Sequence, residues 1–267
     1  MLKSIRRIFE RADRSSLPAI PAGERVYAVG DIHGRLDLFE ALISAIEEDD
    51  AEAGPADTTV ILLGDLVDRG PDSAGVIARA REWQTRRKVR ILAGNHEEMF
   101  LKSFEKIETL RHFLRFGGRE TVLSYGIDRN AYQQASVEEV QAMMEQAVPA
   151  EHRAFIEGFE DKIAMGDYLF VHAGIAPDVP LDEQRRQDLR WIREPFLSHR
   201  ESFGVVVVHG HTICDEPEER ANRIGVDTGA YISGRLTALV LEGTQRRYLE
   251  AVDDNGAITA AARMLAA

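Results

Sequence analysis

Residues 25–34 read RVYAVGDIHG, an apolar run that ends in a glycine, an aspartate and a histidine. The run has the length of a buried strand, and the glycine at its end lets the backbone turn sharply or approach a ligand closely. The pattern returns in TVILLGD (59–65) and KVRILAGNH (88–96), and segments of helical length, 36–48 and 73–86, separate the three runs. This alternation predicts βαβ units around a largely buried sheet.

The rest of the chain divides into an insert, a second group of strands and an N-terminal appendage. Residues 98–165 are charged and helical in period, which predicts a helical insert that overhangs one face. Strand-like runs resume at 168–172, 205–209, 223–226 and 236–241. We therefore expect one α/β domain over residues 23–267, preceded by an appendage over residues 1–22. The start of the appendage has the period of a basic amphipathic helix, which would pack on the domain or contact a membrane surface or a partner.

Composition excludes several classes of protein. The 267 residues include 33 Lys and Arg against 45 Asp and Glu, a net charge of −12, which argues against general nucleic-acid binding. No apolar run approaches the ~20 residues that span a bilayer, so we expect no stable membrane insertion. The first residues lack the apolar region of a secretory signal, and the one cysteine excludes an internal disulfide and a cysteine-based zinc site. The expected location is the cytoplasm.

Five predicted strand ends carry the polar side chains that can do chemistry. The carboxyl ends of strands in an open α/β sheet line the ligand crevice, so these side chains should meet at one edge. Their oxygen and nitrogen donors, without a thiolate, suit Mn, Fe or Zn. A carboxylate can bridge two ions, so the set suffices for a metal pair that activates a shared water and clamps a phosphoryl group. The set consists of Asp31, His33, Asp65, Asn95, His172 and His211.

Three motifs give the sequence a family resemblance. GDIHG (30–34), GDLVDRG (64–70) and GNHE (94–97), in this order, resemble the phosphoprotein phosphatase (PPP) family of calcineurin-like metallophosphoesterases. GGRET (117–121), GHT (210–212) and VDTGA (226–230) are similar to its bacterial serine/threonine phosphatase members. The resemblance covers roughly residues 25–242. It implies an α/β fold of two facing β-sheets flanked by helices, with two divalent metal ions at the strand ends.

The resemblance also implies the metal ligands. The first ion would be held by Asp31, His33 and Asp65. The second ion would be held by the bridging Asp65 together with Asn95, His172 and His211. Manganese is the expected metal, with iron or zinc as alternatives. His209 lies two residues before His211 on the same strand face and could compete as a ligand, but Gly-His-Thr matches the family at His211.

The remaining site residues that the resemblance implies would act on the substrate. His96 would be the general acid that protonates the leaving alkoxide, with Asp68 orienting it, while a metal-bound hydroxide attacks in line. Arg69 and Arg193 would bind the phosphate oxygens, for which a guanidinium has matching geometry. Arg119 is a further candidate contact, with an ordinary surface arginine as the alternative.

The expected function is hydrolysis of phosphomonoesters, with phosphoserine or phosphothreonine in proteins as the substrate. The alternative is symmetrical hydrolysis of dinucleoside polyphosphates such as diadenosine tetraphosphate, because the insert has room to cover a nucleotide. A phosphate-binding module without activity is disfavoured, since no ligand position is substituted. A nuclease is disfavoured by the net charge. Cys214 and Arg220 have the Cys-x5-Arg spacing of cysteine-dependent phosphatases, but four carboxylates between them would repel a phosphate.

Overall fold

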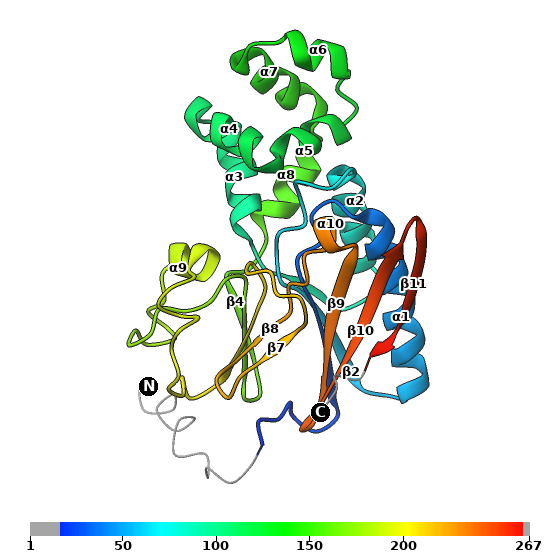
Figure 1. The fold of residues 1–267 in the computed structure, drawn as a ribbon, viewed down its shortest axis with the longest axis vertical. Coiled ribbons are helices and arrows are strands. Elements are labelled where there is room, and N and C mark those ends of the chain that lie inside the picture. The colour runs from blue at the N-terminus through cyan, green and yellow to red at the C-terminus, as the bar shows by residue number, and fades with distance from the viewer. Residues whose placement is uncertain (1–16, 264–267) are drawn as a thin grey trace.

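Two β-sheets pack against each other (Figure 1). Helices cover the outer face of the six-stranded sheet, and loops with the short helix α9 (Arg186–Trp191) cover that of the five-stranded sheet. The computed structural model describes residues 17–263. The six-stranded sheet has the order β11-β10-β9-β1-β2-β3, and the five-stranded sheet has the order β4-β5-β6-β8-β7. The predicted α/β fold of two facing sheets flanked by helices is confirmed. The six-stranded sheet consists of β1 (Glu24–Val29), β2 (Asp57–Leu62), β3 (Val89–Ile91), β9 (Arg235–Glu242), β10 (Gln245–Asp254) and β11 (Ala257–Arg263).

The second sheet is built from the C-terminal half of the chain. Its central strands β5, β6 and β8 run parallel, and β4 and β7 are antiparallel edges. In the first sheet β1, β2 and β3 run parallel, whereas β9, β10 and β11 are antiparallel to their neighbours. The strands are β4 (Lys162–Met165), β5 (Tyr168–Val171), β6 (Val206–His209), β7 (Glu218–Glu219) and β8 (Arg223–Gly225).

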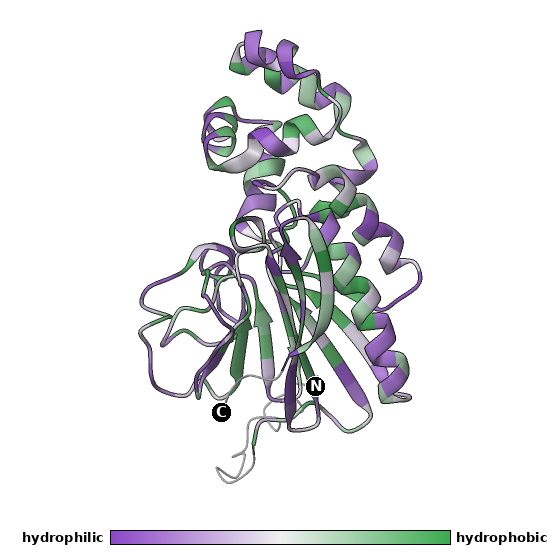
Figure 2. Cartoon of the chain, turned by 45° about the vertical axis from the view of Figure 1, so that its right-hand side comes forward, coloured by the Kyte–Doolittle hydropathy of each residue, from purple (hydrophilic) through white to green (hydrophobic). Residues whose placement is uncertain are grey.

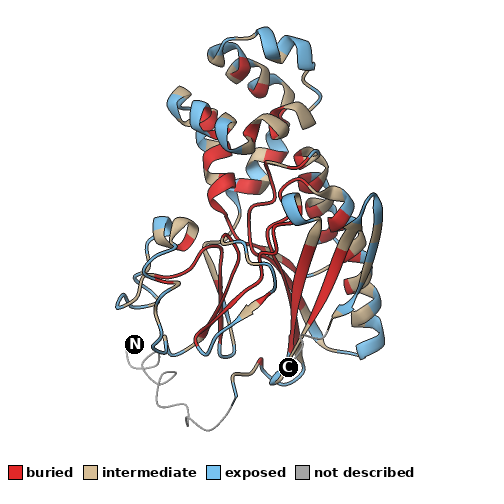
Figure 3. Cartoon of the chain, viewed as in Figure 1, coloured by how far each residue is buried: buried red, intermediate tan, exposed pale blue. Residues whose placement is uncertain are grey.

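The alternation of side chains along each strand explains the two layers of core. In β1, Val26 and Ala28 point into the space between the sheets, where they join Phe170 of β5 and Val208 of β6. Tyr27 and the other alternate residues of β1 point to the opposite face and pack against α1 (Leu36–Ala53) and α2 (Ser73–Gln84). Both faces of the central strands are therefore apolar, as Figures 2 and 3 show by colour and by burial.

The predicted helical insert projects beyond the sheets (Figure 1). Its outermost helices, α6 and α7, are largely exposed (Figure 3), and hydrophilic residues dominate that end (Figure 2). The predicted range, 98–165, extends too far at its end, because residues 162–165 form β4 through backbone pairing with β5. The helices are α3 (Asn95–Ser103), α4 (Ile107–Phe113), α5 (Arg119–Ser124), α6 (Arg129–Gln134), α7 (Val137–Ala147) and α8 (Ala150–Glu157), with a kinked turn over Leu114–Gly118.

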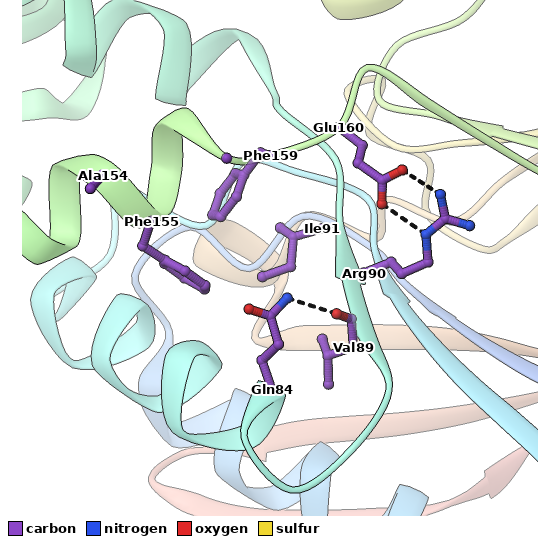
Figure 4. A pocket seen from close by; sticks show the side chains of 9 residues that line it. Gln84, Val89, Arg90, Ile91, Ala154, Phe155, Phe159 and Glu160 are labelled. Atoms are coloured by element: carbon purple, nitrogen blue, oxygen red, sulfur yellow. Dashed lines mark hydrogen bonds and ion pairs between the residues drawn. The ribbon is translucent and has the colours of Figure 1, made fainter.

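A pocket lies where the insert returns to the edge of the first sheet (Figure 4). It has a volume of about 340 Å³ between α8, α2 and β3, and Phe155 and Phe159 line it. Arg90 of β3 pairs there with Glu160, whose backbone bridges to Leu92. None of the candidate site residues lines this pocket. The pocket is therefore a feature of the contact between the insert and the first sheet, separate from the candidate site.

The N-terminal part of the described chain packs on the domain. Ile20 is buried among the side chains between the sheets, and its N–H donates to the carbonyl of Gly243 at 2.9 Å. The predicted amphipathic helix lies outside the described residues. Over residues 17–263, no helix has the length and apolar character needed to cross a bilayer.

Candidate active site

The carboxyl ends of five strands meet at one edge of the two sheets. Asp31 follows β1, Asp65 follows β2, and Asn95 begins α3, the helix that follows β3. His172 follows β5 and His211 follows β6, so the second sheet supplies these two imidazoles. The short helix α10 (Ala230–Ser233) lies beside this edge (Figure 1). The structure therefore brings together side chains that are up to 180 residues apart in the sequence.

Asp65 lies at the centre of this group. Its Oδ2 is 3.6 Å from Nε2 of His33 and 3.4 Å from Nε2 of His172. One donor atom each of Asp65, His172 and His211 lie within 4.8 Å of one another, and the same holds for Asp65, His33 and His96. A carboxylate that faces imidazoles on two sides is arranged as the bridging ligand of a metal pair requires.

The other expected ligands join the same cluster. Oδ1 of Asn95 is 3.1 Å from Nε2 of His172. Both carboxylate oxygens of Asp31 accept the backbone N–H of His211, at 3.2 and 3.0 Å. Nδ1 of His172 contacts the carbonyl of Leu63 at 2.8 Å, and Nδ1 of His33 contacts that of Val67 at 2.8 Å. These contacts leave Nε2 of both rings to face the centre of the cluster.

The loops that carry these residues have an uncommon backbone conformation. Seven non-glycine residues between 17 and 263 have a positive φ, and five of them lie here. Each such residue costs of order 1–3 kcal/mol, so the surrounding contacts must hold the loops. One of these contacts is the pair of N–H groups of Ile32 and His33 on the carbonyl of Asp65, at 3.2 and 2.9 Å. The five residues are His33 (47°), Asp65 (51°), Asp68 (76°), Arg69 (70°) and His211 (63°).

Burial and mutual charge set the protonation of the cluster. Burial, together with the charges of Asp227 and Asp65, raises the pKa of Asp31 well above its usual range. Burial opposes ionisation of Asp65 too, but His172 and His96 hold its pKa well below that range. Burial lowers the pKa of His33 and lowers that of His211 to about 3. Neutral imidazoles are the form that binds a metal.

The residues present fit a pair of divalent ions. Nε2 of His211 is buried and has no hydrogen-bond partner within the described chain. A buried polar atom without a partner lowers the stability of the fold, and a metal ion bound to this nitrogen would supply the partner. The donors are carboxylate and amide oxygens and imidazole nitrogens, the set that Mn, Fe and Zn accept. The charge of Asp65 helps to raise the pKa of Asp31, and bound cations would offset this repulsion.

His96 and Asp68 form a buried pair beside the cluster. Nδ1 of His96 is 2.5 Å from Oδ2 of Asp68, and the backbone N–H of His96 donates to Oδ1 of Asp65 at 3.0 Å. Burial lowers the pKa of His96, but the charge of Asp65 and the contact with Asp68 outweigh it, so the pKa is raised. The imidazole is thus kept protonated to higher pH, as a proton donor requires.

Two hydroxyl groups that the sequence analysis did not single out hold Asp68. Ser73 of α2 and Thr121 of α5 both accept its backbone N–H at 2.9 Å, and both are fully buried. Thr121 lies within the GGRET motif, so the motif was noted but the role of its threonine was missed.

Arg69 reaches the centre of the site. Its Nη1 is 2.8 Å from Nε2 of His33 and its Nη2 is 3.0 Å from Nε2 of His96. The guanidinium lies over the ring of Tyr231, 4.6 Å from its centroid. Arg193 is exposed, and its Nη2 donates to the carbonyl of His211 at 3.3 Å, which places it at the rim of the same cluster.

Arg119 lies apart from the cluster. Its side chain is 39% exposed and pairs loosely with Glu120 at 3.7 Å. Within residues 17–263 it makes no hydrogen bond to the site. Arg119 as a substrate contact therefore stays a prediction, with an ordinary surface arginine as the alternative.

Glu97 is a further residue whose part in the site the sequence analysis missed, although it belongs to the GNHE motif. Its Oε2 accepts the N–H groups of Asp65 and Gly94 at 2.9 Å each. Its Oε1 accepts those of Leu66 at 2.7 Å and Val67 at 3.3 Å. Burial and the charge of Asp65 raise its pKa to about 7. This carboxylate fixes the backbone of the loop that carries Asp65.

Two sequence alternatives can be compared with the structure. His209 contacts the carbonyl of Gly210 through Nδ1 at 3.0 Å, and its ring packs against Phe196 with centroids 5.1 Å apart. His209 belongs to neither group of potential metal ligands, whereas His211 belongs to the group with Asp65 and His172. Cys214 donates to the carbonyl of Asp227 at 3.2 Å, and burial raises its pKa to about 12, so it is not an activated thiol.

Comparison with known proteins agrees with this geometry. Residues 24–230 match the family model described as calcineurin-like phosphoesterase. Serine/threonine-protein phosphatase 1 of Salmonella typhimurium is 29% identical over 79% of this chain and 89% of its own length. The asymmetrical bis(5'-nucleosyl)-tetraphosphatase PrpE of Anoxybacillus flavithermus is 26% identical over 79% of this chain and 88% of its own. A cold-active protein-tyrosine phosphatase of a psychrophilic Shewanella species shares the fold, with a TM-score of 0.55 at 17% identity over 94% of this chain and 88% of that one.

Proposed function

The chain belongs to the calcineurin-like phosphoesterase family, and we propose that it is a dinuclear metal-dependent phosphatase acting on phosphoserine and phosphothreonine in proteins. The observation that carries the proposal is the buried His96–Asp68 pair at 2.5 Å beside a cluster of metal-ligating side chains. A proton donor held this firmly serves a leaving group that is a strong base. The alkoxide of serine or threonine is such a group, while a departing nucleotide phosphate is not.

The proposed metal ligands divide between the two sheets. One ion would be held by Asp31, His33 and Asp65, and the other by Asp65, Asn95, His172 and His211. Two ions at such a site polarise a phosphoryl group and supply hydroxide from water at neutral pH. Manganese is the proposed metal, and the nitrogen and oxygen donors suit iron or zinc as well.

The side chains around the ligands would bind and orient the phosphate. Arg69 lies between His33 and His96 and presents planar N–H groups to the centre. Arg193 reaches the rim beside His211. Guanidinium groups have the geometry that matches the free oxygens of a terminal phosphate. Nε2 of His96 would then face the ester oxygen and donate its proton to the leaving alkoxide, and Asp68 stabilises the protonated ring.

The test replaces His96 with Asn, which removes the proton donor and keeps the metal ligands. General acid catalysis contributes about 10²–10⁴-fold, so we expect a loss of that order on a phosphoserine peptide. The loss on p-nitrophenyl phosphate, whose leaving group needs no proton, should be much smaller. His112→Asn, which changes an exposed histidine of α4, is the matched control. Full activity of His96→Asn on the peptide would refute the assignment.

The second candidate is hydrolysis of dinucleoside polyphosphates, which the name of the Anoxybacillus flavithermus relative favours. The two functions are separated by comparing the metal-reloaded enzyme on a phosphothreonine peptide, a phosphotyrosine peptide and diadenosine tetraphosphate. Phosphate release from the phosphothreonine peptide supports the proposal. Conversion of the dinucleotide with inert peptides supports the second candidate. Chromatography then gives the cleavage mode, since symmetrical hydrolysis yields ADP alone and asymmetrical hydrolysis yields ATP and AMP.

A further inference from the structure

The helical insert contributes a side chain to the His96–Asp68 pair. Thr121 of α5 donates its hydroxyl to Oδ1 of Asp68 at 2.6 Å. The other oxygen of the same carboxylate, Oδ2, contacts Nδ1 of His96 at 2.5 Å. Each oxygen of Asp68 therefore has its own strong partner, one from the insert and one from the proposed acid. Asp68 and Thr121 are both fully buried, so water does not compete for these positions.

Ser73 closes the hydrogen-bond network around Asp68. Its hydroxyl lies 2.8 Å from that of Thr121, and both hydroxyls accept the backbone N–H of Asp68 at 2.9 Å. With the Ser73 hydroxyl as donor to Thr121, the threonine uses its one donor and both of its lone pairs. A network in which every polar atom is satisfied fixes the orientation of its members.

The insert also holds the backbone of the same turn. Asp68 and Arg69 are consecutive residues with φ of 76° and 70°, a conformation that non-glycine residues avoid. The N–H of Arg69 donates to the carbonyl of Gly117 at 3.0 Å. Gly117 and Thr121 thus anchor the two residues that orient the acid and bind the phosphate.

We propose that Thr121 is a positioning residue for the general acid, and that through it the insert forms a working part of the active site. The inference rests on the proposed function, in which His96 donates the proton. The terminal torsion of an aspartate is intrinsically broad. Without the hydroxyl on Oδ1, the carboxylate rotates, and the imidazole that it holds loses its alignment with the leaving oxygen.

The experiment compares Thr121→Val, which keeps the shape and removes the hydroxyl, with Thr121→Ser, which keeps the hydroxyl. Activity is measured on a phosphoserine peptide and on p-nitrophenyl phosphate, and the result is the ratio of the two kcat values. This ratio does not depend on the fraction of protein that is folded. Ser124→Ala is the matched control, because Ser124 lies on the same helix and bonds to the carbonyl of Thr121 and to Ala74. Thr121→Ala replaces the valine variant if that variant does not fold.

We expect Thr121→Val to lower the ratio about tenfold or more. Thr121→Ser and Ser124→Ala should stay within about twofold of the wild type. An unchanged ratio in Thr121→Val, or a serine variant that fails to restore it, would overturn the inference. His96→Asn is measured in parallel. If its ratio is also unchanged, the proposed acid itself is wrong, whereas a fall in His96→Asn alone refutes only the role of Thr121.

Discussion

Replacing Glu97 with Gln tests how the loop that carries Asp65 is held. The carboxylate of Glu97 accepts four backbone N–H groups, two on each oxygen. An amide can accept on its oxygen only. In its better orientation the oxygen keeps the N–H groups of Asp65 and Gly94 at 2.9 Å. The amide NH₂ then faces those of Leu66 and Val67, which lose their acceptor.

The expected cost follows from these contacts. A buried N–H without a partner costs about 1–3 kcal/mol, so the two lost acceptors lower the free energy of unfolding by about 2–6 kcal/mol. This is a large fraction of the ~5–15 kcal/mol that stabilises a typical domain. The loop should also release the positive φ of Asp65, 51°, so metal affinity should fall together with stability.

Urea denaturation with a chelator present measures the effect. The measurement is made at about pH 8, because burial raises the pKa of Glu97 to about 7 and the side chain must be ionised. Glu98→Gln, at the next residue of α3, is the matched control. One oxygen of the Glu98 carboxylate pairs with Lys102, and the other is 3.3 Å from the indole nitrogen of Trp191 and 3.5 Å from Arg190. An amide oxygen can keep the contacts with Trp191 and Arg190, so we expect Glu98→Gln to lower the free energy of unfolding by less than Glu97→Gln. A Glu97→Gln variant within about 1 kcal/mol of the wild type would refute the argument.

Two further predictions follow from the site. Gly117→Ala places a methyl group 2.6 Å from Cγ of Arg69 at a φ of 107°, so we expect displacement of Arg69 to lower kcat/KM about tenfold or more. Gly126→Ala is the control for backbone strain alone, because this glycine has a φ of 82° and a methyl group there would have no neighbour within 4 Å. Equal losses of kcat/KM in both variants would contradict the prediction. Burial lowers the pKa of His209 to about 4, so below pH 6.5 the unfolded chain binds a proton that the folded chain does not. In chelator, stability should therefore fall with decreasing pH by up to about 1.4 kcal/mol per unit for this residue. His209→Gln should flatten the urea-denaturation profile between those pH values, and an unchanged slope would show that other groups cause the loss.

The fold could be predicted from the sequence wherever a strand is buried on both faces. The runs that begin at Val26, Val60 and Tyr168 are apolar without interruption, and they predict the central strands. Strands β10 and β11 were missed, since the C-terminal hairpin is flanked by charged residues and β11 alternates exposed and half-buried positions. The short β4 was assigned to the insert, because Ile163 is its only fully buried residue. The hydrophobic pattern of the sequence is weak in such edge strands, and backbone pairing with a neighbouring strand decides their conformation.

The site could be predicted to the extent that its residues stand in short motifs at strand ends. Asp65, His172 and His211 were expected to meet, and the structure places them within one cluster. Thr121 and Ser73 were missed because they act on Asp68 across 53 and 5 residues of chain, and a lone hydroxyl gives no sequence signal. Within the same GGRET motif, the charge of Arg119 indicates a candidate phosphate contact, whereas nothing in the sequence indicates a role for Thr121. The position of a helix, which decides which side chain points inward, cannot be read from the motif.

The place of β9 in the first sheet has a consequence for how the protein is made. β9 pairs with β1, and Arg25 is paired with Glu242, which follows it by 217 residues. At about 5–20 residues per second, roughly 10–40 s pass on the ribosome between synthesis of the two strands. During that time β1 has an open apolar edge, which favours misassembly with other nascent chains. Slower translation prolongs this exposure, so the yield of folded protein should depend on elongation rate and on chaperones that shield the N-terminal strands.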